Sequence, residues 1–165
     1  MSFQLSLNTE SVTAAYPDEP LFVAPDAALS EVLQLLRAQN TGRVLVCEDG
    51  NTSAQGTCEN GRLVGIFTER DALRLMAAGE DLQQPVSQVM SRAPISIKAD
   101  KSVGEAIKKM SEGGYRQLPI LATDGTPTGL ATVYGIVHYL VDHFPQTIYT
   151  LPPDPSSVPS EREGA

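Results

Sequence analysis

An internal repeat restricts what this chain can fold into more than any other feature of the sequence. Residues 61–73 and 125–137 match at an offset of 64, with Gly61, Gly65 and Thr68 corresponding to Gly125, Gly129 and Thr132. A second match aligns Arg43-Val-Leu-Val with Arg116-Gln-Leu-Pro at an offset of 73, so nine additional residues fall in the polar stretch 48–60. Two units of about sixty residues predict a pseudo-twofold pair, because a solenoid needs three or more repeats.

Each unit is predicted to have the order β-α-β-β-α. In the first unit a helical stripe follows a short extended segment, and its apolar members are Leu29, Val32, Leu33 and Leu36. Asp26 is the expected N-cap of this helix. Strands are expected at 43–47 and 63–67, and a second helix is expected from Thr68 to about Ala78.

The second unit repeats this plan. A three-stranded sheet with two helices leaves one face uncovered, so one unit cannot bury its own sheet. Two copies packed face to face close that surface, which makes the pair the folding unit. The expected fold class is therefore α/β (α+β), with two repeats packed by pseudo-twofold symmetry into one module.

The expected segments are an N-terminal piece packing on the module at 1–19, a first repeat at 20–84 with a loop insert at 48–60, a second repeat at 85–143 and a proline-rich tail at 144–165. The start of the tail is too apolar to be free, so we expect it to dock on a neighbouring surface; its apolar residues are Phe144, Ile148, Tyr149 and Leu151. We recognise no catalytic or transport domain, so we expect the module to act alone or to regulate an effector protein in trans.

Composition excludes several classes of function. A net charge of −8 disfavours nucleic acid, because neutralising phosphates requires clustered lysine and arginine. No apolar run approaches the roughly 20 residues of a membrane span, and the N-terminus lacks the features of a secretory signal. We therefore expect a cytoplasmic protein with no membrane partner. Cys47 and Cys58 can pair across the insert, but an unsecreted chain favours free thiols.

The sequence shows no arrangement typical of an enzyme or a metalloprotein. His138 and His143 lie five positions apart without nearby cysteines, whereas a zinc site needs three or four converging ligands. No nucleophile motif with a locally placed base is present. We expect no catalytic residues, no metal and no required cofactor.

Three stretches give the chain a resemblance to a known family. They are Gly-Ile-Phe-Thr-Glu-Arg-Asp at 65–71, Val-Met-Ser-Arg-Ala-Pro-Ile-Ser-Ile at 89–97 and Gly-Tyr-Arg-Gln-Leu-Pro at 114–119. Repeated in order at matching spacing, they make the chain, over about residues 5–142, resemble a tandem pair of cystathionine-β-synthase (CBS) domains, also called a Bateman module. The resemblance implies a regulatory module that binds AMP, ADP, ATP or S-adenosylmethionine between the repeats, and a disc-like homodimer of modules.

The residues of the repeated motif suit an adenosine ligand. Thr68 opens a helix, whose N-terminal N–H groups form an anion site. Asp71 lies one turn further, where its carboxylate can accept hydrogen bonds from both ribose hydroxyls, and Arg116 can pair with phosphate. The other expected site residues are Ile66 and Ile95 as apolar walls and Tyr115, whose ring is expected either to stack near the ligand or to lie in the core. A purely structural alternative stays open, since Thr68 and Asp71 also fit a capping box.

The second copy departs from this pattern. Thr132 is kept, but Gly135 stands where Asp71 stands in the first copy, so the second cleft lacks a carboxylate for ribose. Arg43, next to Gly42, is the expected phosphate arginine of this degenerate site. It is expected to be empty, weak, or dependent on backbone contacts, and Gly135→Asp is expected to restore it if φ at that position is negative.

Two functions from different classes follow. The first is a sensor of adenosine nucleotides, favoured by Asp71 together with Arg116. The second is a ligand-free scaffold for protein–protein interaction or dimerisation, allowed by Gly135.

Overall fold

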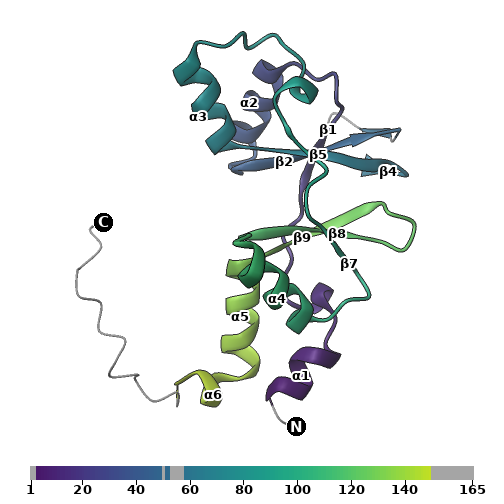
Figure 1. Ribbon diagram of the computed structural model, residues 1–165, viewed down its shortest axis with the longest axis vertical. Coiled ribbons are helices and arrows are strands. Elements are labelled where there is room, and N and C mark those ends of the chain that lie inside the picture. Colours follow the sequence, from purple (N-terminus) through teal and green to yellow (C-terminus); the bar gives the residue numbers. More distant parts are fainter. Residues whose placement is uncertain (1–2, 50, 53–57, 150–165) are drawn as a thin grey trace, which may run out of the picture.

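Two β-sheets face each other at the centre of the computed structural model, and helices cover their outer faces (Figure 1). The structure describes residues 3–49, 51–52 and 58–149. The first sheet has the order β1 (Leu21–Val23), β2 (Arg43–Glu48), β5 (Arg62–Thr68) and β6 (Ser91–Arg92). The second has the order β7 (Ile97–Lys98), β8 (Gln117–Leu121) and β9 (Pro127–Thr132). The expected α+β class and paired arrangement are confirmed.

Four helices cover the sheets, and the repeat predicts each of them. They are α2 (Leu29–Ala38) and α3 (Glu69–Ala78) in the first unit and α4 (Val103–Gly113) and α5 (Val133–His143) in the second. The apolar stripes of α2 and α4 face the cores, and all their members are buried except Leu33 and Ile107, which are half-buried. Gly79 and Gly114 end α3 and α4 in the left-handed conformation, which glycine adopts without a steric penalty.

The predicted N-cap of α2 is wrong. The cap residue is Ala28, which makes no side-chain hydrogen bond, and Asp26 lies outside the helix. The N–H groups of Leu29 and Ser30 instead donate to the carbonyl oxygens of Gln84 (3.0 Å) and Leu82 (2.8 Å). Because these backbone groups already have partners, the helix requires no capping side chain.

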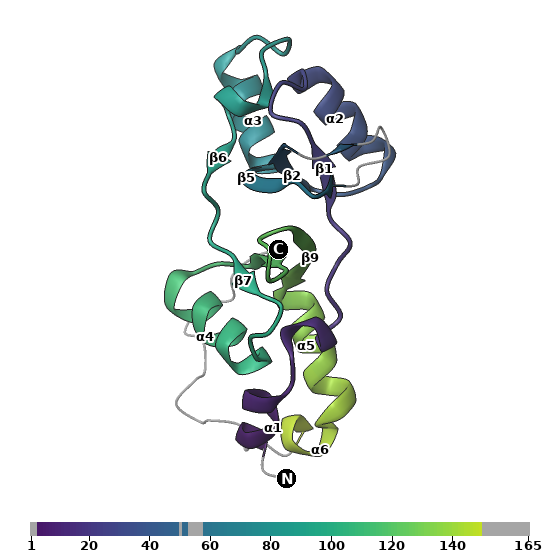
Figure 2. The ribbon, with the colours of Figure 1, turned by 90° about the vertical axis from the view of Figure 1, so that its right-hand side faces the viewer.

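Those partners belong to one of two connecting segments, each of which packs on the other repeat. Val12, in the short 3-10 helix η1 (Val12–Ala14), is fully buried in the core of the second unit. Val86, in η2 (Val86–Gln88), is fully buried in the core of the first. Figure 2 shows the two segments crossing between the units on opposite sides. Each core is thus completed by the segment that precedes the other repeat.

The backbone hydrogen bonds of the two segments are related by the pseudo-twofold symmetry. Val12 N–H donates to Lys101 C=O (2.8 Å), and Val86 N–H donates to Ala27 C=O (2.9 Å). Val103 N–H donates to Glu10 C=O (2.9 Å), matching the bond from Leu29 to Gln84. In each pair of equivalent bonds, the two donors lie 74 positions apart in the sequence, and so do the two acceptors. The exchange of segments between the repeats is therefore reciprocal.

The same offset corrects the sequence alignment of the two repeats. Arg43 pairs with Thr68 across β2 and β5, and Gln117 pairs with Thr132 across β8 and β9. Since the two threonines are equivalent, Arg43 corresponds to Gln117, not to Arg116. The pairing register shifts after Val46 in β2 and after Ile120 in β8, three residues beyond Arg43 and Gln117. The shared position of this irregularity supports the correspondence. The insert is therefore ten residues long rather than nine.

The predicted loop insert contains a short antiparallel pair, β3 (Asn51–Thr52) and β4 (Cys58–Glu59); residues 50 and 53–57 of the predicted loop lie outside the described residues. At the ends of the chain, α1 (Phe3–Thr9) lies against α4, and α6 (Pro145–Tyr149) follows α5. Phe144 packs on the second core, in agreement with the expected docking, whereas Leu151 and the proline-rich remainder of the tail lie outside the described residues.

The exchanged segments should be essential for stability. Val86→Ala removes two buried methyl groups from the first core and is expected to cost about 2 kcal/mol of unfolding free energy. Gln88→Ala, at an exposed position of the same short helix, is the control and should cost less than about 0.5 kcal/mol. Urea unfolding measures both, and equal midpoints for the two variants would contradict the exchange.

Candidate functional site

A cleft of about 770 Å³ lies where the end of the first repeat meets the start of the second. Its lining includes all six residues expected at the first site, namely Ile66, Thr68, Asp71, Ile95, Tyr115 and Arg116. They come from β5, from the start of α3, from the stretch between β6 and β7, and from the residues that lead into β8. The pairing of the repeats thus brings together side chains up to fifty positions apart in the sequence.

Thr68 and Asp71 form the capping box that the alternative interpretation predicts. The N–H of Thr68 donates to Asp71 Oδ2 (2.9 Å), and the Thr68 hydroxyl donates to the same oxygen (2.8 Å). Within the described part of the chain, no donor reaches the other carboxylate oxygen, Oδ1. One carboxylate oxygen therefore caps α3 while the other can accept a ligand hydrogen bond, so Asp71 can serve as a helix cap and as a ligand-binding residue at once.

The residues before β8 form the opposite wall. The carbonyl of Arg116 accepts from Val133 N–H (3.1 Å), which holds its backbone at the start of α5, while its side chain is exposed. In the first repeat, the carbonyl of Gly42 accepts from Glu69 N–H (2.9 Å) in the equivalent bond. Gly42 therefore occupies the position that corresponds to Arg116.

This equivalence corrects the arginine assigned to the second cleft. Arg43 and Gly42 both line the first cleft, alongside Asp71. The Arg43 guanidinium forms an ion pair with Asp18 (3.1 Å) and donates to Gln117 Oε1. The Arg43 side chain thus bridges the N-terminal connecting segment and the second repeat, and Asp18 already neutralises its charge.

Sequence reasoning missed several residues of the cleft wall. Arg70 and Arg74 lie one turn apart on α3, and Glu69 precedes them. Among the described residues, no ion pair joins Arg70 to the neighbouring Asp71. The spacing of four residues was available in the sequence, but only the fold shows that this face of α3 borders the cleft.

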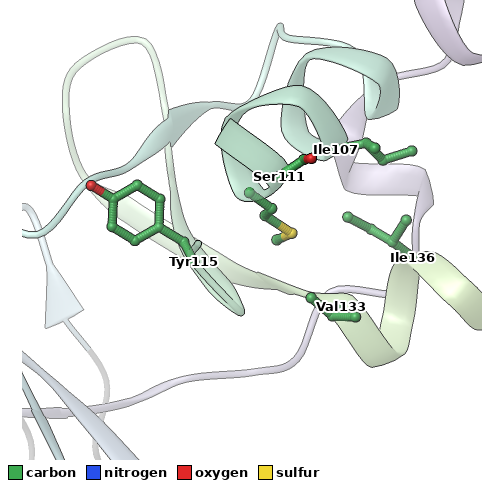
Figure 3. A pocket seen from close by; sticks show the side chains of 6 residues that line it. Ile107, Ser111, Tyr115, Val133 and Ile136 are labelled. Carbon is green, nitrogen blue, oxygen red and sulfur yellow. The ribbon is translucent and has the colours of Figure 1, made fainter. Parts of the chain in front are cut away.

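A second, smaller pocket of about 250 Å³ adjoins the start of α5 (Figure 3). Ile107, Val133 and Ile136 line its apolar wall, and the ring of Tyr115 points away from them. Gly113 permits this placement, because a Cβ there would lie 2.0 Å from Tyr115 Cε2. Tyr115 therefore lies on the border between this pocket and the larger cleft.

The described residues contain no cluster of three or more side chains able to hold a metal ion. They also include no helix with both the length and the apolar character required to span a bilayer.

Cys47 and Cys58 are both buried and free. Burial, and secondly a hydrogen bond with Cys58, raises the pKa of the Cys47 thiol, which keeps it protonated at neutral pH.

A family profile described as "CBS domain" matches residues 13–54 and 86–142, more than half of the chain. The chain belongs to the CBS domain family. The CBS domain-containing protein YhcV of Bacillus subtilis (strain 168) is 35% identical over 100 residues, covering 60% of this chain and 64% of the relative. The chain thus spans just under two thirds of that relative's length.

Solved structures of other CBS proteins have the same fold. The CBS domain protein PAE2072 from Pyrobaculum aerophilum, complexed with AMP, gives a TM-score of 0.65 at 21% identity over 80% of this chain and 98% of that one. The CBS domain pair of MJ0100, in complex with 5′-methylthioadenosine and S-adenosyl-L-methionine, gives 0.63 at 20% identity over 78% and 97%. The expected tandem CBS pair is confirmed.

The second cleft of this CBS pair is closed at the position of the missing carboxylate. Thr132 is buried, and its hydroxyl accepts from Gly135 N–H (3.1 Å) as an N-cap of α5. A Cβ on Gly135 would lie 2.4 Å from the carbonyl oxygen of Tyr16 and 2.8 Å from that of Ala15. The backbone of the N-terminal connecting segment therefore occupies the space that a side chain would need.

This packing overturns the expectation that Gly135→Asp restores a second site. The φ angle at Gly135 is not positive, so the obstacle is the adjacent backbone rather than local strain. Gly135→Ala should lower the unfolding free energy by about 1–3 kcal/mol, and Gly135→Asp by at least as much. Gly129→Ala is the control, since its Cβ would meet neighbours no closer than 3.5 Å. Thermal melting compares the three, and a Gly135→Asp variant as stable as wild type would contradict the close packing.

Proposed function

We propose that this CBS pair is a regulatory module that binds an adenosine-containing ligand in the first cleft. The observation that carries the proposal is the placement of Asp71 in the cleft with one carboxylate oxygen unused, opposite Arg116. A carboxylate can accept from both ribose hydroxyls, and an arginine pairs with phosphate in a bidentate manner. Ile66 and Ile95 offer an apolar surface to a purine, and Ile95 is 44% exposed before any ligand binds.

The complexes of structural relatives support this assignment. PAE2072 was solved with AMP, and the MJ0100 pair with 5′-methylthioadenosine and S-adenosyl-L-methionine. These ligands share the adenosine moiety, which is the part that Asp71 and the apolar walls are suited to hold. We infer that the module is regulatory rather than catalytic and that it requires no cofactor. We also propose that it works in the cytoplasm, where thiols such as Cys47 and Cys58 stay reduced.

Asp71→Ala tests the ligand site, and the chain contains a matched control. Ser102 and Glu105 form an equivalent capping box at the start of α4, outside the cleft. Glu105→Ala therefore removes the N3 side chain of a capping box without touching the site. Each variant should lose a similar, modest amount of stability through its missing N-terminal carboxylate, about 0.3–1 kcal/mol.

Only Asp71→Ala should lose ligand binding, by about 1.5–3 kcal/mol, the scale for hydrogen bonds to a charged group. At a ligand concentration one hundred times Kd, wild type and Glu105→Ala should gain about 2.7 kcal/mol of stability. Differential scanning fluorimetry with AMP, ADP, ATP and S-adenosylmethionine measures this gain. Unchanged melting of the wild type with all four ligands would reject the proposal, as would a gain in Asp71→Ala equal to that of wild type.

Assembly is a second function with its own support, and it is compatible with the first. The outward faces of α3 and α5 carry exposed apolar side chains, namely Leu73, Met76, Val133, Tyr134 and Val137. Leu73 is 68% exposed and Tyr134 73% exposed, which is unusual for large apolar residues on one surface. We infer that two modules pair through these helices, and that an effector protein in trans responds to the ligand-bound dimer.

Dimerisation can be tested without ligand. Sedimentation equilibrium at micromolar concentration should give twice the chain mass of 17.6 kDa. Tyr134→Glu should shift the chain to the monomer, because a charge buried in an apolar contact is costly. Lys108→Glu, on the exposed face of α4, reverses a charge away from these helices and should leave the dimer intact. A wild-type protein that sediments as a monomer at this concentration would contradict the proposed pairing of modules.

A further inference from the structure

The first cleft differs in charge from the rest of the molecule. The chain carries a net charge of −8. The cleft, however, is lined by four arginines and only two carboxylates, namely Arg43, Arg70, Arg74 and Arg116 against Glu69 and Asp71. A positive cleft on an acidic protein concentrates anions from solution.

Three of the four arginines have no ionic partner. Arg43 is paired with Asp18, whereas Arg70, Arg74 and Arg116 form neither an ion pair nor a side-chain hydrogen bond with any residue that the structure describes. All three are exposed. Their donors are therefore available to a ligand without breaking an existing interaction.

The three arginines come from two different elements that line the cleft. Arg70 and Arg74 are four residues apart on α3, so they lie on the same face of the helix about 6 Å apart along its axis. Like charges at this spacing repel each other, and a bound anion relieves the repulsion. Arg116 lies on the opposite wall, before β8. An extended chain of phosphates can contact more of these groups than a single phosphate can.

Building on the proposed function, we propose that this cleft selects adenosine ligands with two or three phosphates, ADP or ATP, over AMP and over S-adenosylmethionine. Asp71 and the apolar walls hold the adenosine that all four ligands share. Arg116 meets the first phosphate, and Arg70 and Arg74 meet those beyond it, since each guanidinium can form paired hydrogen bonds with phosphate oxygens. The sulfonium and ammonium groups of S-adenosylmethionine would instead face these cations.

Isothermal titration of the full chain with ATP, ADP, AMP and S-adenosylmethionine, in buffer without divalent cations, tests this order. ATP should bind at least about tenfold more tightly than AMP, equivalent to about 1.4 kcal/mol, and S-adenosylmethionine should bind most weakly. The double variant Arg70→Gln/Arg74→Gln should reduce the ATP affinity to that of AMP and leave the AMP affinity within about twofold of wild type. Added salt should weaken ATP binding more than AMP binding.

The control is Arg37→Gln/Arg62→Gln, which removes the same charge from positions outside the cleft and should leave the ratio of ATP to AMP affinity unchanged. AMP binding as tight as ATP binding would overturn the selectivity while leaving the nucleotide site in place. Equal weakening of AMP and ATP in the cleft variant would overturn it as well. Failure of all four ligands to bind the wild type would reject both the selectivity and the proposed function.

Discussion

The structure depends on the reciprocal exchange of two connecting segments. Val12 lies in the core of the second repeat and Val86 in that of the first, and each segment supplies backbone partners to the start of a helix in the other unit. Neither repeat completes its core alone, so the two cannot separate without losing buried apolar surface. The exchange also fixes the first cleft, because side chains from both repeats line it.

The same exchange makes the two clefts unequal. At Gly135 the N-terminal segment approaches so closely that no side chain fits, whereas the equivalent position in the first repeat holds Asp71. Arg43, which the sequence alignment assigned to the second cleft, pairs with Asp18 of that segment and lines the first cleft. The first cleft therefore keeps its polar groups available, while in the second the backbone of Ala15 and Tyr16 leaves no room for a side chain at Gly135.

The helices and strands of the two repeats and six residues of the first cleft could be predicted from the sequence, because hydrophobic spacing and the repeated motifs are local signals. The remaining charged residues of its wall, Arg43, Glu69, Arg70 and Arg74, could not. The register of the repeats could not, since the insert hides a difference of one residue, and only the pairing of Arg43 with Thr68 reveals it. The N-cap of α2 was missed because its partners, Gln84 and Leu82, are more than fifty residues away in the sequence. Contacts of this kind depend on tertiary packing, which local patterns do not encode.

A crystal structure of the chain with ATP would test the central claim most directly. The account predicts one adenosine per chain, in the first cleft, with both ribose hydroxyls on Asp71 and the phosphates between Arg116 and the two arginines of α3. It also predicts that the space beside Gly135 stays filled by the backbone of Ala15 and Tyr16. Adenosine bound beside Thr132 instead, or a first cleft left empty at saturating ATP, would contradict the account.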